Sequence, residues 1–305
     1  MRLGFSIRVL GATDLPAFDA TGRGDLGGAM VRLRDILHYA RGKRLRMYRL
    51  HSRVAPQPTG SQSVRDQLHA ARHEIALCGE LARSWDVRLS FHPYSAVVLS
   101  TPDEEAALRS QRLLEGQAGL LDAMGIGPEA VVVLHVGGVY DGVEASLERF
   151  CRRYEALPAS VQERLVLEND DHRYSFAQVL RIQRRIGIPL VFDQLHHQVH
   201  NPEGIAALEA VAEALRSWPH GVAPKIHYAT PRSELKALSD ARVKLPTWTE
   251  HADFADPFAF ARFAREMRPA GDFDVMLESK ARDLAVLKLR EDLARFAPDV
   301  AAWCS

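Results

Sequence analysis

The amino-acid sequence predicts an α/β protein built as a single (β/α)8 TIM barrel, and two observations support this prediction. Eight short apolar runs, rich in β-branched residues and bounded by polar or turn residues, occur along the 305 residues. Segments of helical composition separate them. Strict alternation of strands and helices implies parallel strands joined by crossovers, and eight such units make a closed barrel. We therefore expect one domain over residues 1–305.

The predicted strands lie at residues 2–5, 44–50, 87–93, 130–138, 164–170, 188–197, 223–229 and 273–280. Between them, residues 63–85, 104–124 and 175–186 read as helices because their apolar residues recur every three and four positions. Ser63, Ser175 and the pair Pro102 and Asp103 are the predicted helix starts. A final helix over residues 281–303 is expected to close the barrel.

Composition excludes several classes of protein. The chain has 39 Lys and Arg against 39 Asp and Glu, so binding of nucleic acid would need a local basic patch. Its three cysteines, Cys78, Cys151 and Cys304, are far apart and odd in number, which argues against a disulfide framework or a Cys-x-x-Cys metal site. No apolar stretch approaches the roughly 18 to 20 residues of a membrane span, and the first residues lack a secretory signal. We expect a cytoplasmic protein with no membrane partner.

Side chains that can bind metal ions end six of the eight predicted strands. They are His92, His135, Glu168, Asp193 with His196, Lys225 with His227, and Glu278. Catalytic residues of a barrel lie at the C-terminal ends of its strands. A charged or imidazole group beside a buried strand is costly unless it is paired or coordinated. We therefore expect these side chains to converge on one polar basin at the C-terminal mouth.

Histidines considered singly allow a second interpretation. A lone histidine at a strand end, such as His135, is often a hydrogen-bonded structural residue. Five others fall on predicted helices or loops and are interpreted as surface residues: His38, His69, His73, His172 and His220. The roles of His197 and His200 are left open by the pattern.

The type and number of ligands indicate which ions the basin would hold. Carboxylate and imidazole ligands without thiolates favour Mn²⁺, Zn²⁺ or Fe²⁺ over Ca²⁺ or an iron–sulfur cluster. The ligands are too many for one ion, so two or three divalent ions are predicted. Clustered divalent ions are commonly used for phosphodiester hydrolysis, where they activate water and stabilise the leaving oxygen.

Seven segments, in this order along the chain, resemble the UV damage endonuclease family, which is itself similar to endonuclease IV. They are LSFHP (89–93), VVLHVGG (132–138), LVLEND (165–170), VFDQLHH (191–197), PKIHYA (224–229), EHADF (250–254) and DVMLESK (274–280). The resemblance implies a barrel with a trinuclear, usually manganese, centre that nicks DNA on the 5′ side of a photolesion. It also implies that Lys225 is carboxylated by CO₂, so that a carbamate, rather than an ammonium, faces the ions.

The resemblance carries site residues over by position. It implies that the metal ligands are His92, His135, Glu168, Asp193, His196, Lys225, His227, His251 and Glu278. Of these, Glu168 and Asp193 would bridge or fix the ions, and carboxylated Lys225 would support the centre, so these three are the predicted catalytic residues.

The segments that read DNA damage in the family are different here. After the histidine of the third strand the family has Gly-Gln-Tyr, whereas this chain has Tyr94, Ser95 and Ala96, which leaves Tyr94 as the candidate substrate contact. Residues 5–9 lack the asparagine that the family carries after its first strand. Arg49 and Arg53, at the C-terminal side of the second strand, are predicted to bind a phosphate or carboxylate. A Gly-rich loop over residues 11–30 is interpreted as a lid.

Two functions follow from these observations. The leading hypothesis is a divalent-metal-dependent endonuclease or phosphodiesterase acting on damaged double-stranded DNA, with Mn²⁺ as the first choice of metal and Fe²⁺ or Zn²⁺ as alternatives. The second is the same multinuclear barrel acting on a small molecule or peptide, as an isomerase-like or iron-dependent oxidative enzyme. The replaced Gln-Tyr pair and the zero net charge favour the second hypothesis. The sequence does not predict the oligomeric state.

Overall fold

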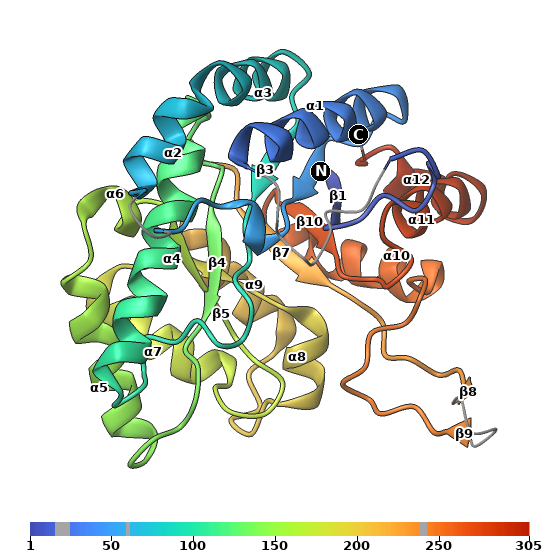
Figure 1. Cartoon of the computed structure of the whole chain (residues 1–305). Coiled ribbons are helices and arrows are strands. Elements are labelled where there is room, and N and C mark those ends of the chain that lie inside the picture. The colour runs from blue at the N-terminus through green and yellow to red at the C-terminus, as the bar shows by residue number, and fades with distance from the viewer. Residues whose placement is uncertain (16–24, 59–61, 238–242, 305) are drawn as a thin grey trace.

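The computed structural model describes residues 1–15, 25–58, 62–237 and 243–304, and these residues form the predicted barrel (Figure 1). Its eight strands are β1 (Leu3–Ser6), β2 (Met47–Arg49), β3 (Arg88–Ser90), β4 (Val132–His135), β5 (Leu165–Glu168), β6 (Leu190–Val191), β7 (Lys225–Tyr228) and β10 (Asp274–Leu277). Seven of them lie inside the predicted runs, and β1 extends one residue beyond its run.

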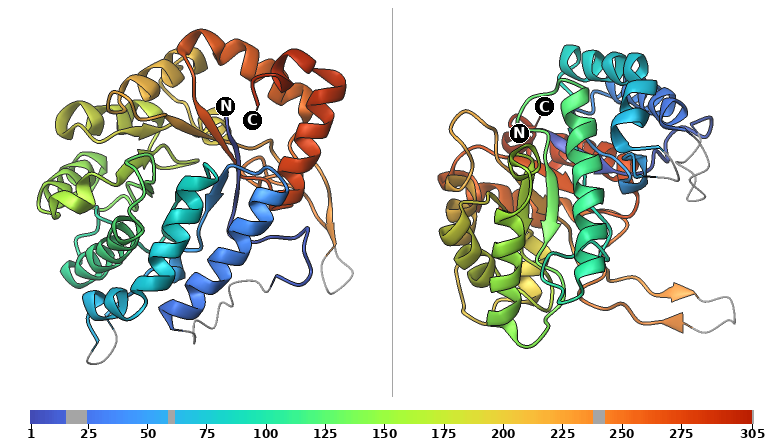
Figure 2. Two further views of the ribbon diagram at one scale, coloured as in Figure 1. Left: turned by 90° about the horizontal axis from the view of Figure 1, so that it is seen from above. Right: turned by 60° about the vertical axis from the view of Figure 1, so that its left-hand side comes forward.

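The eight strands are parallel and follow one another around a closed ring. Hydrogen bonding orders five of them as β3-β2-β1-β10-β7 and the other three as β4-β5-β6. Two parallel bridges join these sheets: Phe91 with Val132 at one seam, and Asp193 with His227 at the other. Seen from above, the helices surround the central strands (Figure 2). The structure thus confirms the predicted TIM barrel.

The helices pack outside the strands. They are α1 (Leu26–Gly42), α2 (Val64–Ala70), α3 (Arg72–Ser84), α4 (Glu104–Ala123), α5 (Val143–Glu155), α6 (Ala159–Gln162), α7 (Phe176–Ile186), α8 (Gln194–Val199), α9 (Ala207–Arg216), α10 (Pro257–Met267), α11 (Arg282–Phe296) and α12 (Pro298–Ala301), with 3₁₀ turns η1 (Ser52–Val54) and η2 (Arg268–Ala270). Among the described residues, none of these helices has both the length and the apolar character that a membrane span needs.

Three predicted segments differ from the structure in their extent. The helix over 63–85 divides at Ala71 into α2 and α3. The helix over 281–303 divides at Ala297, because a residue before proline is disfavoured in the helical conformation. Part of the predicted lid, residues 16–24, lies outside the described residues, and the lid interpretation is wrong for 26–30, where α1 has already begun.

The predicted helix starts are confirmed, and one of them provides a simple stability test. Asp103 caps α4, where its Oδ1 atom accepts hydrogen bonds from the amides of Glu105 at 2.9 Å and Ala106 at 3.1 Å. We expect Asp103→Ala to lower the free energy of unfolding by about 1 kcal/mol in urea denaturation, because two amides lose their acceptor. Asp103→Asn keeps an acceptor oxygen and should stay close to wild type; equal losses in both variants would rule out capping as the cause.

A buried ion pair joins Arg88, the first residue of β3, to Asp274, the first residue of β10. The side chain of Arg88 is fully buried and donates hydrogen bonds to Asp274 Oδ2 at 2.9 Å, the carbonyl of Ala223 at 2.9 Å and the carbonyl of Glu129 at 2.8 Å. Burial lowers the pKa of Arg88, and Asp274 opposes that change. Since the Arg88 charge is buried with its partner, the lower end of the barrel is filled by protein. The site described next lies at the opposite, C-terminal end.

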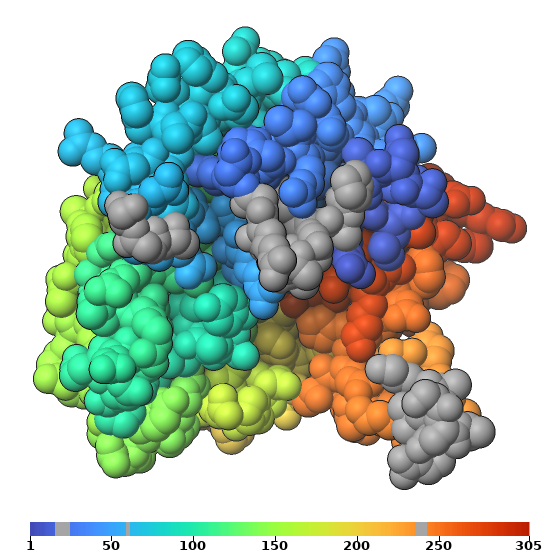
Figure 3. Space-filling view, viewed as in Figure 1, coloured from blue at the N-terminus to red at the C-terminus, as the bar shows by residue number. Residues whose placement is uncertain are grey.

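A hairpin interrupts the connection that follows β7, and the sequence did not predict it. Its strands β8 (Lys236–Ala237) and β9 (Val243–Lys244) pair antiparallel and stand away from the barrel (Figures 1 and 2). Figure 3 shows the surface of the molecule in the same view as Figure 1. At its base Pro231 forms an antiparallel bridge with His251, and the amide of Arg232 donates to the carbonyl of Glu250 at 2.6 Å. The returning limb of the hairpin therefore brings His251 to the mouth of the barrel.

Candidate metal centre

Strand register brings predicted ligands of neighbouring strands to the same height. His135 lies beside Glu168 in the pairing of β4 with β5, and Asp193 bridges His227 across the seam between β6 and β7. Parallel strands carry their C-terminal residues to one end of the barrel. Two pairs of neighbouring strands thus each supply one carboxylate and one imidazole.

Glu168 contacts four of the predicted histidine ligands. Its carboxylate is buried, with Oε2 2.9 Å from His92 Nε2 and 3.4 Å from His135 Nε2. Its other oxygen, Oε1, lies 2.7 Å from His227 Nδ1 and 3.8 Å from His196 Nδ1. Side chains from the ends of β3, β4, β6 and β7 therefore meet at the last residue of β5.

Asp193 is held by a neighbour that the sequence analysis overlooked. Asn169 accepts a hydrogen bond from the amide of Asp193 at 2.9 Å and donates one to its carbonyl at 3.1 Å. The Oδ1 atom of Asp193 accepts from the amide of His196 at 2.8 Å, while Oδ2 is buried without a partner among the described residues. His196 Nδ1 donates to the carbonyl of Asn169 at 2.9 Å, which leaves its Nε2 atom for a ligand. The only sequence signal for Asn169 was its place directly after Glu168.

Glu278 joins the remaining predicted ligands on the other side of the basin. It forms an ion pair with Arg49, and its Oε1 atom lies 3.3 Å from His227 Nδ1. His251 Nδ1 donates to the carbonyl of Glu278 at 2.8 Å and lies 3.7 Å from its Oε2 atom. Arg49 is largely buried, so the structure places its guanidinium against a predicted metal ligand.

Lys225 lies at the start of β7, two residues before His227. Its side chain is fully buried, and Nζ has no hydrogen-bond partner within the described chain. Burial lowers the pKa of Lys225 well below its ordinary value, and the nearby cations Arg88 and Arg49 add to that effect. Burial and these cations consequently favour the neutral amine, the form whose lone pair can react.

The pKa values of the other groups reflect burial and the crowding of charge. Burial raises the pKa of Asp193 and lowers that of His135. For His196, burial acts downward, but Asp193, Glu168 and Glu278 together raise its pKa to about 9. Burial would raise the pKa of Glu278, yet Arg49 and His227 hold it well below the usual range. The negative charge of the buried carboxylates is thus balanced by positively charged imidazolium and guanidinium groups. Bound metal cations would balance the same negative charge.

The donor set fits divalent cations. His92, His135 and Glu168 offer ligand atoms within 4.8 Å of one another, and so do Glu168, Asp193 and His227. The two triads share Glu168. Among the described residues, His135 Nδ1, Asp193 Oδ2 and His227 Nε2 are buried polar atoms without partners, although such atoms are normally satisfied. The arrangement suits at least two neighbouring ions better than one.

A further acidic group lies in the loop after β5 and has a structural explanation. Asp170, Asp171 and His172 also bring ligand atoms within 4.8 Å of one another. The Oδ1 atom of Asp170, however, accepts hydrogen bonds from the amides of His172 and Tyr174, at 3.0 and 2.9 Å, and fixes the turn.

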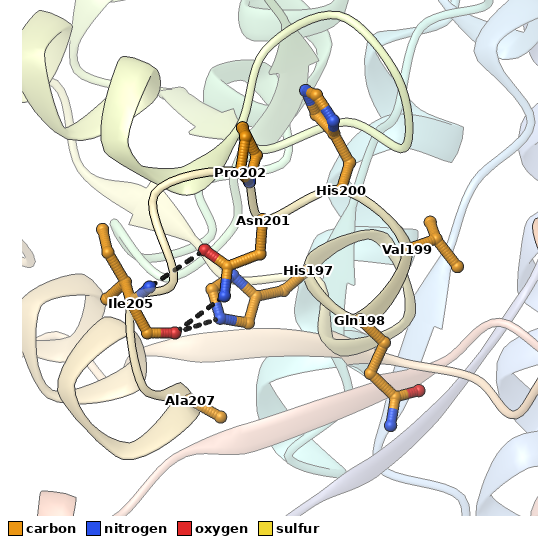
Figure 4. Close-up of a pocket in the computed structure, with 8 residues that line it drawn as sticks. All are labelled: His197, Gln198, Val199, His200, Asn201, Pro202, Ile205 and Ala207. Atoms are coloured by element: carbon orange, nitrogen blue, oxygen red, sulfur yellow. Dashed lines mark hydrogen bonds between the residues drawn. The ribbon is translucent and has the colours of Figure 1, made fainter.

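The structure separates the other histidines from the candidate centre. Those interpreted as surface residues, His38, His69, His73, His172 and His220, are all exposed. His197 donates from Nε2 to the carbonyl of Ile205 at 2.9 Å and lines a surface pocket beside α8 with His200 and Asn201 (Figure 4). The His197 side chain therefore braces the chain after α8, and its ring contacts those of Phe176 and Phe192.

Two predicted substrate contacts lie on loops after the strands. Tyr94 follows β3 with 49% of its surface exposed, and Arg53 is exposed in η1, after β2. Both side chains are therefore exposed at the C-terminal end of the barrel.

Comparison with known proteins finds relatives over most of the chain. The sequence profile of the family described as UV-endonuclease UvdE matches residues 26–304. The UV DNA damage endonuclease of Bacillus velezensis is 32% identical over 276 residues, which cover 88% of this chain and 82% of that protein. The crystal structure of SacUVDE superposes with a TM-score of 0.79 at 29% identity, covering 97% of this chain and 98% of that one.

More distant structures share the fold alone. Endonuclease IV from Thermus thermophilus has a TM-score of 0.55 at 16% identity, covering 96% of this chain and all of that one. D-Psicose 3-epimerase from Clostridium cellulolyticum has a TM-score of 0.57 at 10% identity, covering 97% of this chain and 92% of that one. The barrel is therefore common to nucleases and sugar epimerases, whereas the profile and the closer relatives distinguish between them. On these grounds the chain belongs to the UV-endonuclease UvdE family of DNA damage endonucleases.

Proposed function

We propose that this protein is a divalent-metal-dependent endonuclease that nicks damaged duplex DNA on the 5′ side of a lesion. The observation that carries the proposal is the pair of ligand triads sharing Glu168 at the C-terminal end of the barrel, in a chain of this family. When bound there, divalent ions would polarise the phosphodiester, lower the pKa of water and neutralise charge on the leaving oxygen.

The ligand roles follow from the contacts. His92 and His135 would hold one ion with Glu168, and Asp193 and His227 a second with the same carboxylate. His196, His251 and Glu278 complete the set on the side of β7 and β10, where a third ion would be held. We infer Mn²⁺ as the resident ion, with Fe²⁺ or Zn²⁺ compatible with the same donors.

The surrounding residues would keep the ligands in place. Asn169 fixes the backbone of Asp193 through two hydrogen bonds, and Arg49 holds the carboxylate of Glu278. Such outer contacts orient ligands and tune the affinity for metal.

Lys225 would contribute after modification. Its neutral amine would attack the carbon of CO₂, one C–O π bond would become an oxygen lone pair, and one N–H proton would pass to solvent. The product is a carbamate with one negative charge. This group would face the ions as an anion, in place of the amine whose Nζ atom has no hydrogen-bond partner among the described residues.

The mouth of the barrel is suited to a damaged duplex. Enzymes that act on a lesion inside a duplex need to extrude nucleotides from the base stack. Large apolar side chains are exposed on several loops of this face, including Leu10 at 43%, Tyr94 at 49%, Val139 at 41% and Phe254 at 48%. Tyr94 would offer a ring on which a base can stack, and Arg53 a contact for phosphate.

A nicking assay tests this function. Purified protein with Mn²⁺ is incubated with UV-irradiated, abasic and undamaged duplexes, each labelled at one 5′ end, beside an Asp193→Ala control. We expect cuts 5′ to the lesions in irradiated DNA, and their loss in excess EDTA and in the control. The absence of nicking above the control level on every duplex would reject the function.

The replaced Gln-Tyr pair and the zero net charge favour the small-molecule or peptide alternative, and no contact among the described residues adds to these two sequence observations. The likeness to D-psicose 3-epimerase is at 10% identity and concerns the fold. Tightly bound iron with an oxygen-dependent spectral change in the purified protein would be the finding that supports the oxidative form of that alternative.

A further inference from the structure

A strained turn stands at the mouth of the barrel directly after β1. The amide of Arg8 donates to the carbonyl of Ser6 at 2.7 Å and closes a three-residue turn around Ile7, whose φ is 67°. A γ-turn with positive φ is rare, and the left-handed region is especially unfavourable for a β-branched residue. Such a residue is strained and persists where surrounding contacts impose it, often at functional sites.

The surrounding contacts hold this turn from several sides. The amide of Ile7 donates to the carbonyl of Arg49 at 2.8 Å, and the hydroxyl of Tyr48 donates to the carbonyl of Ile7 at 3.0 Å. Beyond the turn, the amide of Leu10 donates to Asp283 Oδ1 at 2.7 Å. β2 and α11 thus fix the turn by contacts from residues distant in the sequence.

The start of α11 contributes a second strained residue. Arg282 has a φ of 54°, and its Nη1 atom donates to the hydroxyl of Ser6 at 2.8 Å. The two left-handed residues, Ile7 and Arg282, are therefore connected through Ser6. Arg8 is exposed, and within the described residues its side chain makes no hydrogen bond or ion pair.

Cationic side chains gather around this turn. Arg49 has Glu278 as its carboxylate partner. The pKa of Arg282 is lowered by burial and then by repulsion from Arg49, with Arg8 contributing as well. The pKa of His51 is lowered by burial and by the neighbouring cations Arg53 and Arg8. Cations that repel one another in this way are stabilised by an anion.

We propose that Arg8 and Arg282, presented by the turn around Ile7, bind a backbone phosphate of DNA that flanks the phosphate at the candidate metal centre. The proposal rests on the proposed function. The turn follows Ser6, which lies level with Arg49 in the pairing of β1 with β2, and Arg49 contacts the predicted ligand Glu278. Guanidinium groups match the geometry of phosphate oxygens, and a backbone that fixes both groups beforehand lowers the entropy lost on binding.

The test measures DNA affinity as a function of salt. Arg8→Gln and the full-length wild type, both without metal and in EDTA, are titrated with a short UV-irradiated duplex at several salt concentrations. We expect the Kd for DNA of Arg8→Gln to rise about tenfold, because the variant loses one charge-assisted hydrogen bond to phosphate. The magnitude of the slope of log K against log salt should fall by about 0.9, because one fewer phosphate is neutralised. The Tm should not fall, since the Arg8 side chain makes no hydrogen bond or ion pair within the described residues.

A matched control and a second variant separate binding from folding. Arg152→Gln removes an exposed arginine near the C-terminal end of α5, away from the mouth, and should leave both Kd and slope unchanged. Arg282→Gly removes the guanidinium, and it also removes the backbone strain at position 282 because glycine adopts a positive φ without steric cost. DNA binding should therefore weaken without a fall in Tm. A merely structural role for Arg282 would instead lower the Tm.

The outcomes distinguish this proposal from the proposed function. If the wild type nicks irradiated DNA but Arg8→Gln keeps the affinity and salt slope of Arg152→Gln, the phosphate site is wrong and the function stands. If Arg8→Gln loses affinity but the wild type never nicks, the phosphate site stands and the function fails. No measurable binding of DNA by the wild type would overturn both.

Discussion

Glu168→Gln is expected to reduce the nicking rate on UV-irradiated duplex by on the order of 10²–10³-fold or more, the range found when one catalytic electrostatic contact is removed. The glutamine keeps the size and hydrogen-bonding reach of the side chain but removes the charge that both ligand triads share. We also expect the number of Mn²⁺ ions bound per chain to fall. Single-turnover nicking and equilibrium dialysis would measure the two effects.

A surface carboxylate provides the matched control for this variant. Glu148→Gln on α5 breaks an exposed ion pair with Arg185 and should leave both rate and metal content unchanged. If Glu168→Gln bound the wild-type number of ions at wild-type affinity, the shared carboxylate would not be the centre of the site.

Lys225→Met is expected to abolish nicking while making the metal-free protein more stable. Methionine has similar length and lacks the polar nitrogen that is buried without a partner in the described chain. Removing an unsatisfied buried polar group recovers about 1–3 kcal/mol. Each kcal/mol corresponds to a Tm rise of about 2–4 °C in domains of 150–250 residues. Calorimetry in EDTA checks the stability, and the nicking assay checks the activity.

The stability difference should depend on pH in one direction. Burial lowers the pKa of Lys225 in the folded state, so at pH values between that pKa and the unfolded value of about 10.4 the unfolded chain binds one more proton. Lowering the pH from about 10 toward 7 therefore penalises folding of the wild type but not of Lys225→Met. The gap in Tm should widen as the pH falls.

Carbon dioxide supplies an independent readout for the same lysine. Removing dissolved CO₂ should lower the metal content and nicking rate of the wild type, and bicarbonate should restore both. Lys225→Met should respond to neither treatment. Indifference of the wild type to both would count against the carbamate, while leaving the ligand triads untouched.

The barrel, and the convergence of most of the predicted ligands on one end of it, were predictable because both leave local signals in the sequence. Short apolar runs mark the strands, and a polar residue near the end of such a run, such as Glu168 or His227, stands out against its neighbours. The closed ring then brings these positions together. Residue type and strand position were sufficient for that inference.

The remaining features depend on contacts between residues distant in the sequence. Nothing local favours a left-handed Ile7, and its conformation is imposed by Arg49 and by the residues that bind the following loop. Asn169 acts through the backbone of Asp193, in the next strand. The hairpin has strands of two residues each, too short to show an alternating pattern.

The hairpin after β7 leaves and rejoins the barrel at adjoining points. Pro231 bridges His251, so the two ends of the intervening segment are already held together, whatever lies between them. The entropy of closing such a segment grows slowly with its length. Trp248 and Leu245, each 72% exposed, add no packing to the barrel. The length and sequence of this segment can consequently change during evolution with little effect on the position of His251. Such changes would alter which parts of a substrate contact the segment while the predicted ligands stay in place.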